Sequence, residues 1–219
     1  MKDTYKINKL EAPIINEEWD GFVRASPYPK YQTLRTHQPV NAEGLPSEVV
    51  FYSQLGQDKF VVEHLNGKRD GVWVDIGCNQ SISLSNTYFL ERNLGWRGIS
   101  IDMLDWIPRD WQGVRNKDML YAPCDALELN YEEEFNKQGF PEVIDYLTID
   151  IEEATTPAMK LIPWDKYKFR VITIEHNAYT DNGEQMNIQR EFLSDKGYTL
   201  EIAGNLAGCA QDDFWVLND

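Results

Sequence analysis

Residues 72–102 read VWVDIGCNQSISLSNTYFLERNLGWRGISID and contain two apolar stretches separated by a glycine turn and a helical pattern. We expect a first strand ending at Asp75, a tight turn at Gly77, a helix to about Leu94 and a second strand ending at Asp102. This order is half of a nucleotide-binding α/β unit. An acidic residue that ends the second strand suits a ribose, because one carboxylate accepts hydrogen bonds from both hydroxyls.

The alternation of strands and helices continues along the chain. Further strands are expected at 118–123, 143–150 and 170–176, and two closing strands at 198–204 and 212–218. Helices are expected at about 54–65, 84–94, 107–114, 131–138, 154–161 and 184–196. Near-continuous apolar strands separated by helices predict an α/β fold with a mostly parallel, Rossmann-like sheet covered by helices on both faces. The closing strands lack a helix between them, so the last strand should be antiparallel.

The first 48 residues differ from the rest of the chain. They are rich in proline and aromatic residues and lack sustained periodicity, so we predict an N-terminal arm over 1–48 and one domain over 49–219. Either the arm drapes over the mouth of the domain's site, or it covers a sheet edge or a neighbouring subunit of a homodimer. The sequence does not separate these alternatives.

Composition narrows the classes of partner. The net charge is −15 and the lysines and arginines are scattered, so nucleic acid is disfavoured as a substrate. The cysteines, Cys78, Cys124 and Cys209, are far apart in sequence and indicate reduced thiols. No stretch resembles a signal sequence or a membrane span, so we expect a cytoplasmic protein without a membrane partner.

Acidic residues follow or close five successive strands, at Asp75, Asp102, Asp125, Asp150 and Glu175. The ligands of parallel sheets bind outside the carboxyl ends of the strands. A buried charge is costly without a partner, so this repetition indicates a ligand site at one edge of the sheet.

The turn after the first strand, Gly77-Cys78-Asn79-Gln80-Ser81, keeps only the first glycine of the G-x-G-x-x-G pattern. A pyrophosphate is therefore a poor fit, and S-adenosylmethionine, an adenosine without phosphate, fits better. Gly77 and Asn79 would lie at the amino-acid end of this cofactor, with Asp75 holding its ammonium directly or through water. Gln57, from the helix before the strand, would reach the same end. The alternative is that Gly77 is only a turn glycine.

The other end of the cofactor is assigned to residues after the next two strands. Asp102 would bind the ribose hydroxyls and Met103 would pack on the adenine face. Asp125, beside Ala126, is placed to accept a hydrogen bond from the adenine amino group. Asp125 could equally cap the helical turn that follows it.

Asp150 and Glu175, with His176 and Asn177, end neighbouring strands and should converge on the reacting atoms. One of Asp150, Glu175 and His176 could remove a proton from the acceptor as the catalytic base. Alternatively Asp150, Glu175 and Asn177 could bind a divalent cation, magnesium or manganese, through oxygen ligands. His176 could also be a core histidine without a chemical role.

Several segments together resemble the FkbM-type family of S-adenosylmethionine-dependent methyltransferases: SQLGQDKFV, VDIGCNQSISLSNTYFLE, GWRGISID, IDYLTIDIE, ITIEHN, FLSDKGYTL and DDFWVLN. This resemblance covers about 53–217. It implies a Rossmann-like class I methyltransferase with a seven-stranded sheet that usually methylates a hydroxyl of a small or sugar-like molecule. It also places Asp75 and Gly77 at the cofactor turn, and Glu152 with Asp150 and Glu175 on the substrate side.

The chain departs from the family pattern at three places. Cys78 and Ser81 stand where the family usually has alanine and glycine, and Asp102-Met103 stands where it commonly has Glu-Pro. Glu153-Ala154-Thr155 replaces a common Gly-Ala-Glu run. We expect an S-adenosylmethionine-dependent methyltransferase, most simply an O-methyltransferase. A non-catalytic nucleoside-binding protein with the same fold is the alternative, and the missing glycines count against a nicotinamide-dependent reductase.

Overall fold

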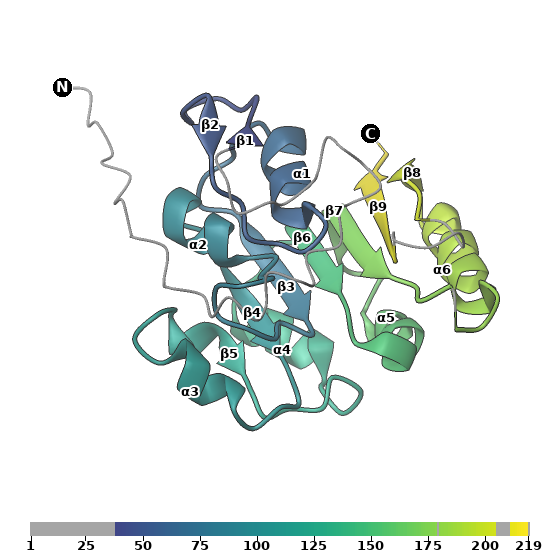
Figure 1. Ribbon diagram of the computed structural model, residues 1–219. Helices are drawn as coiled ribbons and strands as arrows, with labels where there is room; N and C mark the ends of the chain where they lie inside the picture. Colours follow the sequence, from purple (N-terminus) through teal and green to yellow (C-terminus); the bar gives the residue numbers. More distant parts are fainter. Residues whose placement is uncertain (1–37, 179, 205–210, 219) are drawn as a thin grey trace.

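The computed structural model describes residues 38–178, 180–204 and 211–218. Its main element is a seven-stranded sheet with the order β5-β4-β3-β6-β7-β9-β8 (Figure 1). The strands are β3 (Val72–Ile76), β4 (Arg97–Ile101), β5 (Leu120–Tyr121), β6 (Val143–Ile149), β7 (Lys168–Glu175), β8 (Tyr198–Ile202) and β9 (Asp212–Leu217). Strands β5, β4, β3, β6 and β7 are parallel, whereas β9 is antiparallel to β7 and to β8. This confirms the predicted Rossmann-like class I methyltransferase fold with an antiparallel last strand.

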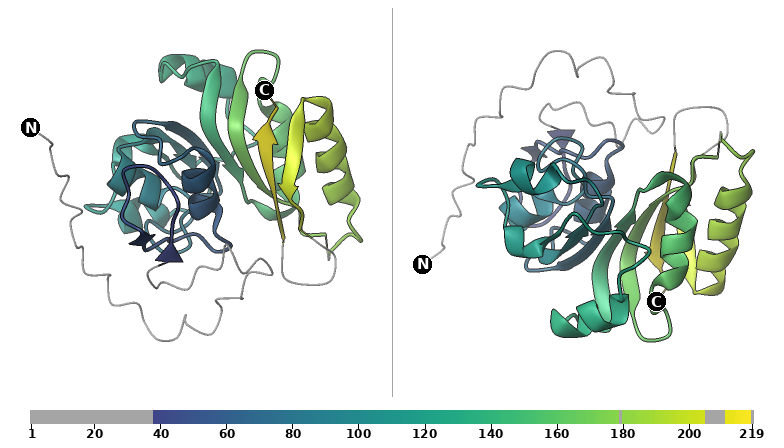
Figure 2. Two further views of the ribbon diagram at one scale, coloured as in Figure 1. Left: turned by 90° about the horizontal axis from the view of Figure 1, so that it is seen from above. Right: turned by 90° about the horizontal axis from the view of Figure 1, so that it is seen from below.

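Alternate residues of each strand face two separate cores, as the pleat of a strand requires. Val74 of β3 packs against α4 (Tyr131–Lys137), α5 (Thr155–Leu161) and α6 (Glu184–Asp195). Trp73 faces the opposite core, beneath α1 (Gln57–His64) and α2 (Tyr88–Leu94). Each large apolar side chain buried in these cores contributes about 1.5–3 kcal/mol. The views from above and below show helices on both sides of the sheet (Figure 2).

The connection from β3 to α2 differs from the prediction. The helix expected from about 84 begins only at Tyr88. Leu84 has a left-handed backbone with φ 62° and pairs with Ser53 in an isolated bridge, so it does not continue a helix. The Ser85 hydroxyl accepts a hydrogen bond from the Tyr88 amide at 3.1 Å and so satisfies a donor at the start of α2. A long polar loop therefore lies above the end of β3.

The third strand of the parallel part is shorter than expected. Residues Lys117–Met119 form a 3₁₀ turn, and β5 is limited to Leu120–Tyr121. The fold also contains α3 (Ile107–Trp111), which packs on Cys78 at the carboxyl edge of the sheet. None of the described helices is both long and apolar enough to cross a membrane.

The start of the described chain forms a small antiparallel pair, β1 (Gln38–Pro39) and β2 (Glu48–Val49). Val40 and Val49 of this region pack into the same core as Phe51. The remainder of the predicted arm, residues 1–37, lies outside the described residues, as does Cys209. Its relation to the site stays a prediction.

Candidate functional site

The carboxyl ends of the parallel strands gather acidic side chains at one edge of the sheet. Asp75 belongs to the end of β3, Asp102 follows β4, Asp150 follows β6 and Glu175 ends β7. Asp212, at the start of the antiparallel β9, pairs in register with Glu175 and joins them. Four of the five predicted carboxylates therefore gather at this edge together with Asp212, which was not predicted, whereas Asp125 is exposed.

The turn after β3 is tightly enclosed by its neighbours. The amides of Gly77 and Cys78 donate to the Ile101 carbonyl of β4, at 2.8 and 3.2 Å. Gly77 has φ +90°, and a Cβ there would lie 1.9 Å from the Asp150 carbonyl oxygen. Glycine is required at this position by the backbone of β6 as well as by its own conformation. The turn-glycine interpretation of Gly77 thus has a direct structural basis.

Asp102 is held between two loops of the site. Its Oδ2 accepts from the Asn79 amide at 2.9 Å, and its Oδ1 accepts from the Leu104 amide at 3.0 Å. Asn79 has a left-handed backbone, with φ 46°, which turns its amide toward Asp102. A carboxylate has about four acceptor positions, so both oxygens retain capacity for the hydroxyls of a ribose.

An apolar surface adjoins Asp102. Met103 is 69% exposed, and Leu104, Trp106 and Leu127 are also exposed. Four of the five exposed large apolar side chains among the described residues thus follow β4 or β5. Exposed apolar side chains of this kind are a common feature of ligand sites.

Asp125 and Ala126 have different environments. Asp125 is exposed, and its Oδ1 accepts from the Leu127 amide at 2.8 Å, as expected for the residue that begins a turn. Ala126 is buried in the core, and its carbonyl accepts from the Tyr131 hydroxyl at 2.9 Å. The geometry favours the capping alternative for Asp125, and it leaves the side chain of Ala126 facing the core.

Asp150 and Glu175 form a hydrogen-bonded pair of carboxyl groups. Burial and the neighbouring Asp150 raise the pKa of Glu175 to about 11. Burial also raises the pKa of Asp150, while the hydrogen bond from Glu175 opposes that rise. Glu175 therefore keeps its proton at neutral pH and donates a hydrogen bond to Asp150.

Gln57 reaches the same edge, and both polar atoms of its side chain have a hydrogen-bond partner there. Its Oε1 accepts from the Leu55 amide at 2.8 Å, and its Nε2 donates to Asp212 Oδ2 at 2.7 Å. Burial and Asp150 raise the pKa of Asp212 to about 8, and the bond from Gln57 counteracts part of this. In this structure Gln57 supports Asp212.

His176 is buried, and its Nδ1 accepts from the Ala178 amide at 3.2 Å. The ring proton must then be on Nε2, which lies 3.7 Å from Asp213 Oδ1. Burial lowers the pKa of His176. With Nδ1 occupied and Nε2 protonated, the neutral ring has no lone pair to offer a substrate. This matches the core-histidine alternative.

The proposed metal ligands Asp150, Glu175 and Asn177 stay a prediction. The Asn177 side chain donates through Nδ2 to Glu152 Oε2 at 2.6 Å, and its buried Oδ1 has no hydrogen-bond partner among the described residues. Among the described residues, no group of three or more His, Cys, Asp and Glu side chains is arranged to hold a metal ion. A hard cation requires several deprotonated oxygen ligands.

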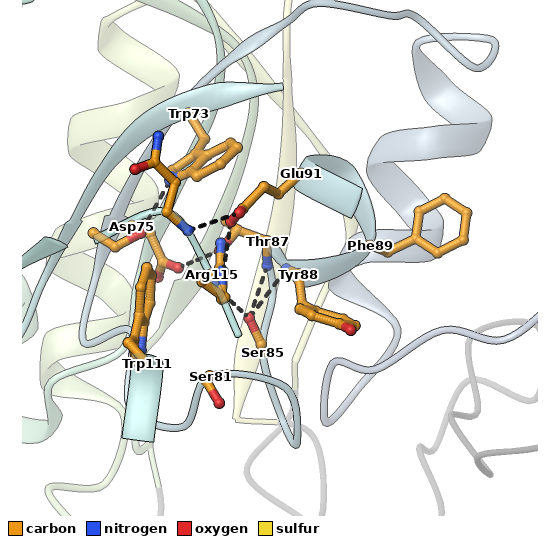
Figure 3. A network of polar contacts seen from close by, with 12 residues as sticks. Trp73, Asp75, Ser81, Ser85, Thr87, Tyr88, Phe89, Glu91, Trp111 and Arg115 are labelled. Carbon is orange, nitrogen blue, oxygen red and sulfur yellow. Dashed lines mark hydrogen bonds and ion pairs between the residues drawn. The ribbon is translucent and has the colours of Figure 1, made fainter. Parts of the chain in front are cut away.

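Arg115 was not identified from the sequence, although it lies at the centre of a polar network beside Asp75 (Figure 3). Its Nε donates to Glu91 Oε2 at 2.7 Å, Nη1 to Ser85 Oγ at 3.1 Å and Nη2 to Thr87 Oγ1 at 3.0 Å. Thr87 Oγ1 in turn donates to Asp75 Oδ2 at 2.8 Å. A lone arginine in a polar loop carries no local sequence signal of burial, so only the fold reveals this network.

No protein-family model matches the chain, and no curated protein matches its sequence. Several solved structures are similar. A precorrin-6y C5,15-methyltransferase from Geobacter metallireducens GS-15 shares 15% identity over 85% of this chain and 94% of its own, with a TM-score of 0.47. An S-adenosylmethionine-dependent O-methyltransferase from Thermotoga maritima shares 14% identity over 73% of this chain and 64% of its own, with a TM-score of 0.46.

A third similar structure is fibrillarin from Aeropyrum pernix with natively bound S-adenosyl-L-methionine. It shares 14% identity over 84% of this chain and 89% of its own, with a TM-score of 0.44. None of the three is named as FkbM-type. With identities of 15% or less and TM-scores below 0.5, these proteins indicate nothing about the substrate of this chain.

Proposed function

We propose that the chain is an S-adenosylmethionine-dependent methyltransferase of the FkbM type that methylates a hydroxyl of a small or sugar-like molecule. The observation that carries this proposal is the position of Asp102. It follows the strand next to β3, is fixed by the amides of Asn79 and Leu104, and adjoins exposed apolar side chains. A carboxylate beside an apolar surface at this edge of a Rossmann-like sheet suits the ribose and adenine of an adenosine.

The cofactor would extend from this point across the turn after β3. Asp102 accepts from the ribose hydroxyls and Met103 covers the adenine. The amino-acid end would then lie over Gly77, with its ammonium directed to Asp75. Among the described residues, Thr87 donates a hydrogen bond to Oδ2 of Asp75. Oδ1 of Asp75 is then the atom that would accept from the ammonium of the ligand.

The acceptor would approach from the side of β6 and β7, where Asp150 and Glu175 lie. Asp150 accepts the hydrogen bond from Glu175 and is the base in this proposal. An acceptor hydroxyl gives its proton to Asp150 while its oxygen forms a bond to the methyl carbon. The bond between methyl and sulfur breaks, and the electron pair stays on sulfur. Alignment of the reactants supplies most of the rate increase.

Charge also favours this arrangement. The sulfonium of the cofactor is a cation, and the carboxylates at the sheet edge attract it. The net charge of −15 opposes a nucleic acid as acceptor. An uncharged small hydroxyl compound is not repelled by this charge.

Calorimetry with S-adenosylhomocysteine tests the cofactor site. We expect the unmodified protein to bind it, and Asp102→Asn to weaken binding by about tenfold or more, since a hydrogen bond to a charged group contributes about 1.5–3 kcal/mol. Asp105→Asn is the matched control because Asp105 is exposed and carries the same charge. Equal affinities of the two variants would contradict the ribose assignment.

A second measurement separates an enzyme from a binding protein. Methyl release from S-adenosylmethionine is followed with a library of small hydroxyl compounds and sugars. Transfer to one of them supports the proposal. Tight binding of S-adenosylhomocysteine without transfer to any member supports the alternative, a non-catalytic nucleoside-binding protein.

A further inference from the structure

Arg115 is a buried cation that contacts three other segments of the chain. It bonds Glu91 of α2 and the hydroxyls of Ser85 and Thr87 in the loop after β3. Its guanidinium also lies 4.1 Å from the ring centre of Trp111 of α3. Figure 3 shows these side chains directed toward the guanidinium. Burial of an arginine is costly, so a hydrogen bond from each of its three side-chain nitrogens marks a group with a defined position.

The bonds of Arg115 fix the direction of the next hydrogen bond. Thr87 Oγ1 accepts a proton from Arg115 Nη2, and an arginine can only donate. The single hydroxyl proton of Thr87 is therefore available for Asp75, whose Oδ2 lies 2.8 Å away. A donated hydrogen bond favours the charged carboxylate over the neutral acid. Arg115 thus acts on Asp75 through Thr87.

We propose that Arg115 is a positioning residue for the cofactor: through Thr87 it holds the Asp75 carboxylate, by Oδ2, in the orientation in which Oδ1 receives the ammonium of the cofactor's amino-acid end. This inference rests on the proposed function, because it assigns Asp75 to S-adenosylmethionine. Neither Arg115 nor Thr87 touches the cofactor. Their effect reaches the ligand only by way of Asp75.

The surroundings of Asp75 make its charge sensitive to this support. Burial raises its pKa to about 7, while the Thr87 bond and Arg115 counteract the rise. The other titratable groups that interact with Asp75, from the elements around it, are Asp102, Asp150, Cys78 and Tyr146. All four are neutral or negative. Among these interacting groups of the described residues, Arg115 is the one that carries a positive charge.

The test compares Thr87→Val with Thr87→Ser. Valine keeps the shape of threonine but removes the hydroxyl, whereas serine restores it. Affinity is measured by calorimetry between about pH 6 and about pH 8.5, a range that brackets the pKa given above. Two probes are used: S-adenosylhomocysteine, which has an ammonium, and methylthioadenosine, which has none.

We expect the unmodified protein to bind S-adenosylhomocysteine more weakly as the pH falls through about 7, and to bind methylthioadenosine equally at all pH values. Thr87→Val should move the midpoint to higher pH and weaken S-adenosylhomocysteine binding at pH 7 by about tenfold per pKa unit of movement. Thr87→Ser should restore the original profile. Methylthioadenosine binding should not change in either variant, which shows that the adenosine contacts are intact.

Two results would overturn the proposal. One is a flat pH profile of S-adenosylhomocysteine binding in the unmodified protein, which needs no variant. The other is an equal loss of both probes in Thr87→Val, which would assign a merely structural role to the network. If the unmodified protein binds neither probe, the proposed function itself fails, and this outcome differs from both of the others.

Discussion

At the scale of single residues, the pair of Asp150 and Glu175 shows how burial separates two similar groups. Both are carboxyl groups that follow or end neighbouring parallel strands. Glu175 retains its proton because burial and the negative Asp150 both oppose its ionisation. Asp150 is stabilised by the proton that Glu175 donates. Two interacting carboxyls with different proton affinities are a common arrangement of a base and its support.

A matched pair of substitutions tests this division of roles. Asp150→Asn removes the base, and we expect kcat for methyl transfer to fall by about 100-fold or more. Glu175→Gln retains a hydrogen-bond donor to Asp150, so we expect a loss below about tenfold. Activity should rise with pH as Asp150 loses its proton. The reverse order of effects, with Glu175→Gln the more damaging, would identify Glu175 as the base.

Residues of the site were predictable where their position along a strand decided their environment. Asp102 and Asp150 were identified because each follows an apolar strand. Asp212 was not, because it begins its strand, and only the antiparallel direction of β9 brings it to the same edge. Arg115 was missed because its burial depends on Glu91 and Thr87, which are distant in sequence.

At the scale of elements, the junction of β3 and β6 determines the shape of the site. The Asp150 amide donates to the Ile76 carbonyl at 2.9 Å, and the Asp150 carbonyl lies against Gly77. The strand order reverses between these two strands, because β4 and β5 lie on one side of β3 and β6 lies on the other, and ligands of such sheets bind at this point. The close contact sets the floor of the site at this point. The sequence predicted the turn but could not show which neighbour requires its glycine.

Gly77→Ala should therefore be far more harmful than an ordinary glycine substitution. Its Cβ would lie 1.9 Å from the Asp150 carbonyl oxygen, so the two strand ends must separate. We expect a loss of stability of about 3 kcal/mol or more, measured by urea denaturation. Gly139→Ala is the control, with φ +63° and no atom within 4 Å of the added Cβ. It should cost only about 1–2 kcal/mol, for the left-handed backbone. Equal losses would contradict the contact.

The same comparison explains the limits of predicting elements from periodicity. Strands β6 and β7 are long and apolar, and their predicted bounds agree closely with the structure. The start of α2 was placed too early because Leu84 fits a helical pattern, whereas its bridge to Ser53 holds it in a left-handed conformation. A contact between distant segments outweighs local propensity at that residue.

At the scale of the whole molecule, the order of the strands is a finding of the structure that the pattern of apolar residues did not predict. Alternating strands and helices indicate a parallel sheet but leave its order open. The observed order brings β3 between β4 and β6, so that Asp75 lies between Asp102 and Asp150. This arrangement gathers carboxyl groups at one edge of the sheet, and burial raises the pKa of Asp75, Asp212 and Glu175. Ionising these groups in the folded protein is therefore unfavourable, so the free energy of unfolding depends on pH.

The last prediction concerns that cost in the ligand-free protein. The folded-state pKa values are about 7 for Asp75, about 8 for Asp212 and about 11 for Glu175, all above the ordinary values of 3.8 or 4.5. Between those ordinary values and the folded ones, the folded state binds more protons than the unfolded state. Stability from these groups is thus complete at low pH and is lost as the pH rises through the folded pKa values.

The free energy of unfolding should fall between about pH 6.5 and about pH 8.5. Each group contributes on the order of 1 kcal/mol per pH unit over the range in which it is protonated in the folded state but not in the unfolded state. A histidine with lowered pKa, such as His176, has the opposite effect on stability, which is nearly complete at about pH 7.5, where the unfolded histidine has lost most of its proton. Urea denaturation at several pH values measures the slope. Asp212→Asn should make it shallower, because the amide does not titrate yet still accepts from Gln57. The exposed Asp105→Asn should leave it unchanged. A free energy of unfolding that is constant or rises over this range would mean that the carboxyl groups at the sheet edge are ionised and solvated. Glu175 would then not be protonated, and the assignment of Asp150 as the base would have to be abandoned.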